Sequence, residues 1–180
     1  MKPVIFVTGN ENKVREAEAV IGVHFTQRQH NLDEVQELDL KKVVEHKARQ
    51  AYAIYKQPLI VEDVSFEIEQ WRGFPGPFAK WLGKTIGYGE LATTLKKGNR
   101  RALWRAMYAY NDGKQIRFFE GREQGSVAHK PRGTTGFGFD IIFIPAGKKK
   151  TVAELGPEQK AKTSARYLAL CKLKKFLQAL

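Results

Sequence analysis

The segment Val4-Ile5-Phe6-Val7-Thr8-Gly9-Asn10 decides the class of fold that this chain adopts. Its first four residues are β-branched or aromatic, which favours a strand, and the Thr-Gly-Asn that follows is typical of a tight turn. Apolar residues then recur at Val14, Ala17 and Val20-Ile21, which is helical spacing. The segment therefore predicts a strand, a turn and a helix in succession, as in an α/β protein.

The alternation continues with a second helix and a second strand. Apolar spacing from Leu40 to Tyr55 predicts a helix, which Pro58 ends. The run Leu59-Ile60-Val61 predicts a strand that ends at Glu62-Asp63. Two glycines and two prolines in Gly73-Phe74-Pro75-Gly76-Pro77 exclude the interior of a regular element, so we expect a rigid turn or loop there.

The second half of the chain predicts an antiparallel meander and a final helix. Trp104 to Tyr110 and Ile116 to Phe119 are strand-like and flank the turn sequence Asn111-Asp112-Gly113. A further strand is expected over Ile141 to Ile144 and a last helix over Pro157 to Leu180. No internal repeat and no linker rich in Pro, Gly or Ser divides the sequence, so we expect residues 1–180 to form one domain.

The composition is that of an ordinary globular protein, with 180 residues, 42% hydrophobic and 28% charged. No apolar run approaches the roughly 20 residues that a membrane-spanning helix needs. The apolar start of the chain is shorter than the core of a signal peptide, about 7–15 residues, so we expect a cytoplasmic protein with no membrane partner. The single cysteine, Cys171, cannot form an internal disulfide, which agrees with a reducing compartment.

The net charge narrows the class of partner. Thirty-one Lys and Arg against nineteen Asp and Glu give +12, so the surface attracts anions. Nucleic acid, a polyphosphate nucleotide and an anionic membrane surface all fit this charge. So does the alternative of a protein with solvated, lysine-rich faces.

The turn before the first helix is a candidate phosphate site. Backbone N–H groups of Thr8 to Asn12 and the positive end of the helix dipole can hold phosphate, and Lys13 adds a point charge. The segment is not a Walker A loop, which requires a second glycine followed by Lys and Ser or Thr. The alternative is structural, because a turn with one glycine before a helix is common in α/β proteins.

The adjacent carboxylates Glu62 and Asp63 are a candidate metal or catalytic site. They follow an apolar strand, where buried carboxylates are costly unless a metal or a cation compensates them. Alternation along the strand sends the two side chains to opposite faces, so a given cleft receives one of them. Glu34 is a candidate second acidic ligand. In the structural alternative, Glu62 and Asp63 only cap the next turn.

Two further segments can recognise a base. In Gly136-Phe137-Gly138-Phe139-Asp140, an aromatic ring can stack on a nucleobase and Asp140 can accept a hydrogen bond from a base edge. Lys160, Ser164 and Arg166 fall on roughly one face near the start of the last helix. The alternatives are core packing for the phenylalanines and a solvated face for the basic residues.

Taken in order, these motifs resemble the inosine triphosphate pyrophosphatase family, whose members remove inosine and xanthosine triphosphates from the nucleotide pool. The resemblance runs nearly end to end. It is carried by Thr8-Gly9-Asn10-x-x-Lys13, Glu34-Val35-Gln36, Val61-Glu62-Asp63, Gly73-Phe74-Pro75-Gly76-Pro77, Gly136-Phe137-Gly138-Phe139-Asp140, and Glu154 through Lys160 to Ser164-x-Arg166.

The resemblance implies a fold and a set of roles. It implies an elongated mixed β-sheet with flanking helices, two lobes with a nucleotide cleft between them, a homodimer and a Mg²⁺ cofactor. It implies that Glu34 and Asp63 bind the metal and that Asp63, Glu62 and Lys13 are catalytic. Substrate-binding positions by the same resemblance are Thr8, Gly9, Asn10, Asn12, Lys13, Lys47, Lys80, Phe137, Gly138, Phe139, Asp140, Lys160, Ser164 and Arg166.

The implied chemistry suits these residue types. Water attacks the α-phosphorus and expels pyrophosphate, so magnesium and lysines neutralise charge while a carboxylate orients or deprotonates the water. Asp63 is our choice for that base, with Glu62 as the alternative. A site that hydrogen-bonds a 6-keto oxygen rejects an amino purine, since the wrong base leaves buried donors unpaired.

Two departures from the family pattern bear on specificity. The family normally has Ser-His-Arg where this chain has Ser164-Ala165-Arg166, so a base-site imidazole is missing. The segment Val64-Ser65-Phe66 after the acidic pair also differs, with an effect expected on packing. A pyrophosphatase for another modified nucleotide therefore remains an alternative, as does a family member that binds nucleotide without hydrolysing it.

A nucleic-acid-binding module is the remaining alternative. In it the basic surface holds DNA or RNA and Trp71, Trp81 and Trp104 act as stacking platforms. The carboxylate pair argues against this function, so nucleic acid is not an expected partner.

Overall fold

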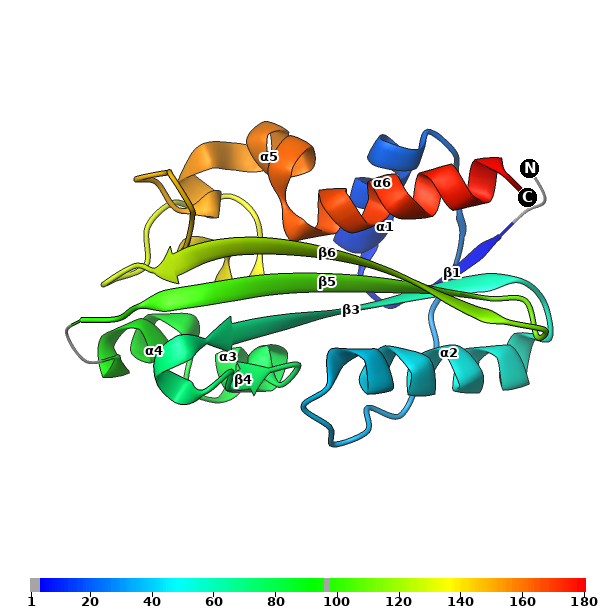
Figure 1. Cartoon of the computed structure of the whole chain (residues 1–180), viewed down its shortest axis with the longest axis horizontal. Coiled ribbons are helices and arrows are strands. Elements are labelled where there is room, and N and C mark those ends of the chain that lie inside the picture. Colours follow the sequence, from blue (N-terminus) through cyan, green and yellow to red (C-terminus); the bar gives the residue numbers. More distant parts are fainter. Residues whose placement is uncertain (1–3, 96–97) are drawn as a thin grey trace. The chain divides into compact units, whose positions relative to one another are not determined.

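A computed structural model describes residues 4–95 and 98–180 as helices and strands that alternate along the chain (Figure 1). The elements, in order, are β1 (Ile5–Val7), α1 (Glu11–Ile21), β2 (Thr26–Arg28), α2 (Leu40–Tyr55), β3 (Leu59–Ile68), the 3₁₀ helix η1 (Glu69–Trp71), β4 (Pro75–Gly76), α3 (Ala79–Thr85), α4 (Tyr88–Thr94), β5 (Arg101–Asn111), β6 (Ile116–Val127), the 3₁₀ helix η2 (Gly138–Ile141), β7 (Phe143–Pro145), α5 (Val152–Thr163) and α6 (Ala165–Gln178).

The strand, turn and helix predicted at the N-terminal end are confirmed as β1 and α1, and the second predicted helix coincides with α2. Helix α2 begins after Asp39, whose side chain accepts a hydrogen bond from the backbone N–H of Lys41. It ends at Tyr55, and the capping residue Lys56 takes the left-handed conformation with φ 51°.

Three predicted strand boundaries are wrong, and the first is the end of β6, which lies at Val127 and not at Phe119. Strand β3 does not end at Glu62-Asp63 but continues to Ile68, because the alternating buried positions Phe66 and Ile68 extend its apolar face. The strand expected from Ile141 begins instead at Phe143, because Gly138–Ile141 forms the 3₁₀ helix η2. Gly138 has φ 66°, a conformation that side chains disfavour in a strand.

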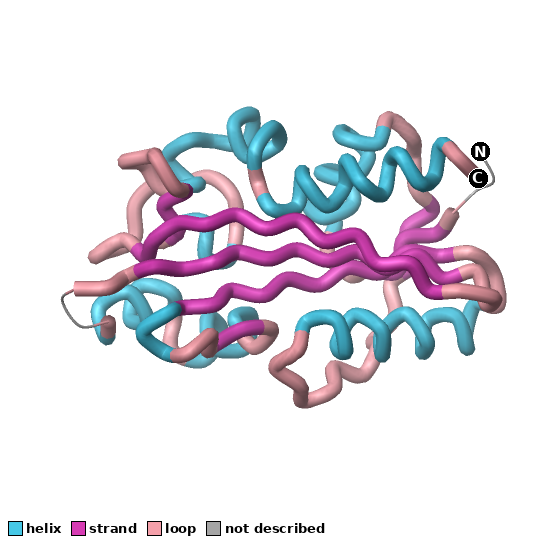
Figure 2. The backbone as a smooth tube through the Cα atoms, viewed as in Figure 1, coloured by secondary structure: helices cyan, strands magenta, loops and turns pink. Residues whose placement is uncertain are grey.

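The single long C-terminal helix was also a wrong prediction. Ser164 is extended, with φ −63° and ψ 158°, and separates α5 from α6, an interruption that Figure 2 shows. Helix α5 is itself kinked at Gly156, and Pro157 follows that kink. Lys160 and Arg166 therefore lie on different helices and do not share one face.

The strands form a mixed sheet in the order β2-β1-β3-β5-β6-β7, with β4 beside β3. Strand β1 is parallel to both β2 and β3, whereas β3 with β4 and β6 with β7 are antiparallel. Only four residues connect the neighbouring strands β5 and β6, which requires an antiparallel pair. The predicted mixed α/β sheet with a meander is therefore confirmed.

The chain divides into two compact units built from several segments each. Unit 1 contains residues 1–63, 106–121 and 166–180, and unit 2 contains residues 64–105 and 122–165. The boundary between the units falls directly after Asp63 and directly before Arg166.

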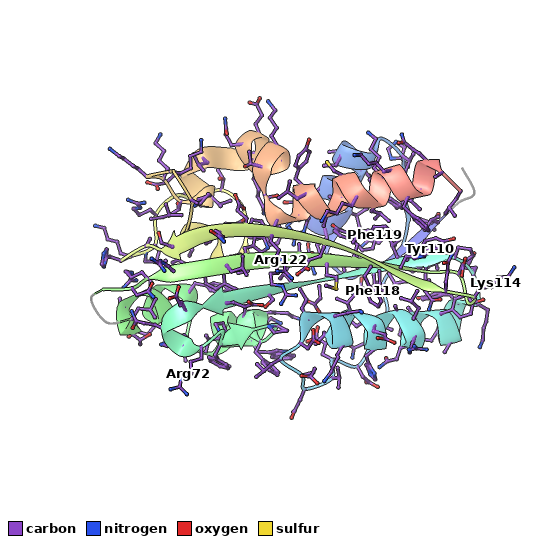
Figure 3. All side chains as sticks on the ribbon, in the orientation of Figure 1. Arg72, Tyr110, Lys114, Phe118, Phe119 and Arg122 are labelled. Atoms are coloured by element: carbon purple, nitrogen blue, oxygen red, sulfur yellow. The ribbon has the colours of Figure 1, made fainter. Side chains whose placement is uncertain are left out.

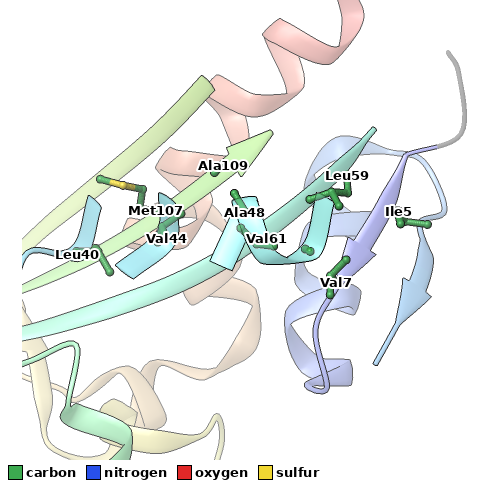
Figure 4. Close-up of a cluster of buried hydrophobic side chains, with 10 residues drawn as sticks. Ile5, Val7, Leu40, Val44, Ala48, Leu59, Val61, Met107 and Ala109 are labelled. Carbon is green, nitrogen blue, oxygen red and sulfur yellow. The ribbon is translucent and has the colours of Figure 1, made fainter. Parts of the chain in front are cut away.

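Alternation along the strands of unit 1 sorts its core into two faces. Val7, Val61 and Met107 point to one face and pack against Val44 and Ala48 of α2, in the cluster drawn in Figure 4. The other face carries aromatic residues. The Phe6 ring lies 5.9 Å from the Tyr108 ring. Tyr110 and Phe119, which are labelled in Figure 3, both contact Phe176 of α6 at 5.1 Å between ring centroids.

An aromatic cluster forms the core of unit 2. Phe139 of η2 is stacked on Phe66 at 4.4 Å between centroids and lies edge-on to Trp104 at 5.4 Å. Phe143 also contacts Phe66 and Trp104 edge-on. These geometries are the favoured ones for aromatic pairs and fix η2 against β3 and β5.

No helix within the described residues is both long enough and apolar enough to cross a membrane.

Candidate functional site

The predicted phosphate loop lies between β1 and α1 and is ordered by its own side chains. The Thr8 hydroxyl accepts from the Asn10 N–H at 3.1 Å, and the Asn10 side chain caps α1 by accepting from the Asn12 N–H at 3.0 Å. The Thr8 N–H donates to the Arg28 carbonyl of β2. Several N–H groups that the sequence suggested for phosphate are therefore engaged within the protein, and Lys13 lies just after the loop, in the first turn of α1.

Glu62 is the centre of a buried charged cluster, here called the Glu62 cluster: Lys13, Glu16, Glu62 and Arg166. Glu62 Oε2 forms an ion pair with Lys13, and Oε1 accepts from Arg166 Nε at 3.0 Å. Arg166 Nη1 also bonds Glu16 at 2.6 Å. The Glu62 side chain has no exposed surface and that of Arg166 is 2% exposed. The cluster joins α1, β3 and α6 within unit 1.

The paired charges decide the protonation states in the Glu62 cluster. Burial alone raises the pKa of Glu62, but the charges of Lys13 and Arg166 outweigh it and the pKa lies below the usual value. Burial likewise opposes the charge of Arg166, and Glu62 and Glu16 reverse that effect and raise its pKa. Burial also raises the pKa of Tyr108, whose ring borders the same charges. Glu62 and Arg166 are therefore both charged at neutral pH.

Asp63, the next residue, lies in a second charged cluster, here called the Lys47 cluster: Glu34, Lys47 and Asp63. Lys47 of α2 bonds Asp63 and, at 3.1 Å, Glu34. Alternation along β3 explains why adjacent carboxylates meet different helices, as the sequence predicted. The Asp63 side chain is 16% exposed and that of Glu34 is 31% exposed. Unlike the Glu62 cluster, this one is open to ligands.

The Lys47 ammonium holds two carboxylates together. Burial tends to lower the pKa of Lys47, but attraction and hydrogen bonds from Asp63 and Glu34 prevail and raise it. Glu34 and Asp63 offer hard carboxylate oxygens, the ligand type that Mg²⁺ prefers, and Mg²⁺ commonly takes one or two carboxylates with water and phosphate oxygens. This donor set fits magnesium. Among residues 4–95 and 98–180, no group of three or more His, Cys, Asp or Glu side chains is placed to hold a metal alone.

The base-recognition residues predicted in unit 2 meet in a third cluster, here called the Lys160 cluster: Phe137, Asp140 and Lys160. Lys160 Nζ lies 2.8 Å from Asp140 Oδ2 and 4.0 Å from the centroid of the Phe137 ring. Asp140 also accepts from the Phe137 N–H at 2.8 Å. Asp140 and Lys160 are buried, whereas Phe137 is half-buried. A Cβ at Gly136 would lie 2.3 Å from Asp140, so glycine is needed there.

The structure places the other predicted substrate residues differently. Phe139 is 6% exposed and packs in the aromatic core, as the structural alternative anticipated, while its neighbour Gly138 opens η2. Ser164 is buried and donates its backbone N–H to the Lys160 carbonyl. Lys80 of α3 lies over the Trp81 ring in unit 2. Arg166 binds Glu62 and Glu16, and its expected place around the purine stays a prediction.

Three neighbours of these clusters were missed by the sequence analysis. Glu16 and Tyr108 border Arg166, and Glu123 of β6 is influenced by Asp140 and Lys160. Glu16 lies three residues after Lys13, on the same face of α1, and this spacing was the available signal. Tyr108 and Glu123 are joined to their partners only by the tertiary fold.

Two surface hollows of unit 2, of about 610 and 700 Å³, contain none of the predicted site residues. The first is lined by Arg100, Arg101 and Lys130 among others, and the second by Glu67 and Arg72 among others. Arg100 is already committed to structure, because it bonds the carbonyls of Val127, Leu95, Ala92 and Ala128.

The mixed α/β sheet, the loop between β1 and α1 and the charged clusters on β3 define a class of globular α/β protein with a candidate anion site. The model of the Ham1 family matches residues 4–176. This chain belongs to the Ham1 family.

Relatives cover almost the whole sequence. An inosine triphosphate pyrophosphatase of Batrachochytrium dendrobatidis is 39% identical over 99% of this chain and 96% of the relative. A dITP/XTP pyrophosphatase of Thermococcus kodakarensis is 38% identical over 92% of this chain and 91% of the relative. The family resemblance drawn from the motifs is therefore confirmed.

Solved structures agree on the fold. A HAM1 protein from Coxiella burnetii superimposes with a TM-score of 0.88 over 100% of both chains at 22% identity. The Ham1 protein of Staphylococcus aureus gives a TM-score of 0.78 at 21% identity, covering 97% of this chain and 98% of that one.

Proposed function

We propose that this chain hydrolyses non-standard purine nucleoside triphosphates, namely inosine, deoxyinosine and xanthosine triphosphates, to the monophosphate and pyrophosphate. The observation that carries the proposal is the near full-length similarity, at 39% identity, to a protein named inosine triphosphate pyrophosphatase. The Lys47 cluster supports it, because two partly exposed carboxylates and a half-buried lysine suit phosphoanhydride hydrolysis.

The loop between β1 and α1 is our candidate for the triphosphate. Its conformation is fixed before any ligand binds, through Thr8 and Asn10, and Lys13 supplies positive charge beside it. Gly9 supports this role. A Cβ there would meet only the Gln29 side chain at 3.5 Å, an ordinary contact, so the fold itself does not demand a glycine. A bare backbone at Gly9 instead allows phosphate to approach closely.

Asp63 is our candidate for the group that orients and deprotonates the attacking water. Its neighbour Glu62 is a poor base, since both of its oxygens bind cations and its side chain has no exposed surface. In this proposal Glu62 instead positions Lys13 and Arg166. Water oxygen forms a bond to the α-phosphorus, the α–β bridging bond breaks, and pyrophosphate leaves with the bonding electrons.

Magnesium would be held by Glu34 and Asp63. The Lys47 ammonium, which contacts both carboxylates, would change its position to accommodate the ion. The ion supplies neutralisation of phosphate charge and polarisation of phosphoryl oxygens when it is bound. Because Asp63 and Glu34 raise the pKa of Lys47, its side chain is protonated at neutral pH.

The Lys160 cluster is our candidate for base recognition. The Phe137 ring offers a stacking surface, and Lys160 can donate to the 6-keto oxygen of hypoxanthine or xanthine. Gly138, Phe139 and Ser164 would support this region through the backbone and the core. Lys80 stays a proposed contact to phosphate or sugar, and a homodimer in the cytoplasm stays our expectation for the whole protein.

One observation favours a second candidate, a pyrophosphatase with a shifted base preference. Ala165 stands where the family pattern has histidine, and it is fully buried. No imidazole reaches the base from that position.

The test is release of pyrophosphate and orthophosphate from a panel of inosine, xanthosine, standard and modified triphosphates, with magnesium and with a chelator. We expect magnesium-dependent pyrophosphate release that favours inosine or xanthosine triphosphate. Preference for another base would establish the second candidate, and no turnover of any triphosphate would refute both.

A further inference from the structure

Glu123 of β6 is a half-buried carboxyl group that the proposed reaction leaves without a role. Its Oε2 atom is shielded from solvent and has no hydrogen-bond partner among the described residues. The carboxylate is bonded by the backbone N–H of Ala165 at the start of α6. Its sequence neighbour Arg122, labelled in Figure 3, is by contrast exposed, as alternation along the strand requires.

The surroundings of Glu123 are the proposed base site. The charged groups that influence it are Asp140 on η2 and Lys160 on α5, the two buried members of the Lys160 cluster. A buried acceptor without a partner is costly to a fold. Such a group therefore points to a ligand that completes it, and the ligand proposed for the Lys160 cluster is the base.

Glu123 and Lys160 together offer a ligand one hydrogen-bond acceptor next to one donor. Lys160 is donor-only and an ionised carboxylate is acceptor-only. A purine with a 6-keto oxygen carries an N–H at the adjacent ring position, so it presents an acceptor and a donor side by side. Adenine presents the reverse pattern, an amino donor beside a ring-nitrogen lone pair.

We infer that Glu123 is a specificity-determining residue, whose ionised carboxylate accepts the ring N–H of a 6-keto purine while Lys160 donates to the keto oxygen. The inference rests on the proposed function and deepens it. It also supplies a polar group at the place where Ala165 leaves no imidazole, since the Ala165 backbone N–H itself holds the Glu123 carboxylate.

The protonation state of Glu123 decides how strongly it discriminates against adenine. Burial, followed in smaller measure by the charge of Asp140, raises the pKa of Glu123 to about 7, against the opposing influence of the Ala165 N–H and of Lys160. Above that pH the carboxylate repels the ring-nitrogen lone pair of adenine. Below it the protonated carboxyl can donate to that lone pair, so discrimination against adenine weakens.

The experiment is the ratio of kcat/KM for inosine triphosphate to kcat/KM for adenosine triphosphate between about pH 5.5 and about pH 8, a range that spans the Glu123 titration. Titration of the triphosphate and of the catalytic groups is common to both substrates and cancels in the ratio. We expect the ratio to rise about tenfold across this range in the unmodified protein, the effect of one hydrogen bond gained or opposed. Glu123→Gln should give a flat ratio.

Two controls separate this role from a structural one. Glu69→Gln removes the same charge from an exposed position of unit 2 and should keep the pH dependence. Glu123→Gln should also be more stable than the unmodified protein at pH 8, with the advantage shrinking towards pH 5. The sign follows because a raised carboxyl pKa makes the folded state lose stability as pH rises through that pKa.

The outcomes distinguish the inference from the function beneath it. A pH-dependent ratio that persists in Glu123→Gln would overturn the inference while leaving the pyrophosphatase intact. Absence of turnover with every triphosphate would overturn the proposed function first. A flat ratio in the unmodified protein, with normal inosine triphosphate hydrolysis, would also refute the inference.

Discussion

Glu62 and Asp63 are neighbours in sequence with the same charge, yet β3 turns them into two different regions of unit 1. Glu62 faces α1 and α6, has no exposed side-chain surface and is bound by Lys13 and Arg166. Asp63 faces α2, is 16% exposed and shares Lys47 with Glu34. A buried carboxylate bound through both oxygens can position other groups, whereas a partly exposed one can meet substrate and metal. The surroundings of Glu62 and Asp63, and not their residue type, therefore decide which of them positions other groups and which can take part in the chemistry.

The largest effect is expected at Asp63, on the face of β3 where the carboxylate is partly exposed. Asp63→Asn should lower kcat for inosine triphosphate by about a thousandfold or more, on the order of the loss of a general base together with a metal ligand. Thermal unfolding should stay close to that of the unmodified protein, because the side chain is partly exposed and keeps its shape. A rate within a few-fold of normal would remove Asp63 as the base.

In the buried Glu62 cluster, on the opposite face of β3, we expect a substitution to lower mainly the free energy of unfolding. Arg166→Met leaves Glu62 and Glu16 without their shared cation and should cost about 3–5 kcal/mol of unfolding free energy. Denaturant unfolding measures it. The double variant Glu16→Gln with Arg166→Met removes one of the two carboxylates that Arg166 binds, keeps the Lys13–Glu62 ion pair and should recover much of the loss. Equal instability of both variants would show that the arginine acts through packing alone.

The Lys160 cluster tests whether the same distinction extends to unit 2. Lys160→Met combined with Asp140→Asn removes the buried pair without leaving a lone charge. The preference for inosine over adenosine triphosphate should fall about 10–100-fold, while stability changes little. The ratio of kcat/KM values and the unfolding midpoint provide the two readings. An unchanged ratio would exclude this cluster from base recognition.

The smallest expected effect is at Ala165. The side chain has no exposed surface, so Ala165→His should overpack its site and destabilise the protein by about 1–2 kcal/mol. The site of Ala165 is therefore too small to accept the family's histidine unless other residues change as well. Ala165→Gly is the matched control, since it adds no volume. A histidine variant as stable as the unmodified protein would show that this site has room after all.

The sequence predicted the alternating α/β elements, the bounds of α2 and the opposite directions of Glu62 and Asp63, because these follow from local periodicity. It failed at the end of β3 and at the break between α5 and α6. A charged residue such as Glu62 predicts the end of a buried strand, because the sequence does not show that Arg166 of α6 compensates its charge. The extended Ser164 interrupts an otherwise continuous helical pattern. Arg166 and Glu123 found their partners through tertiary contacts that no spacing encodes.

The pairing of Glu62 with Arg166 also bears on the order of events at the ribosome. The two residues are 104 positions apart, and Arg166 begins the last segment of unit 1. During synthesis β1, α1 and β3 emerge long before α6, so the nascent unit 1 must carry Glu62 without its guanidinium partner while all of unit 2 is translated. Closing so long a loop is entropically slow compared with forming local contacts. Completion of unit 1 is therefore expected only after α6 has left the exit tunnel.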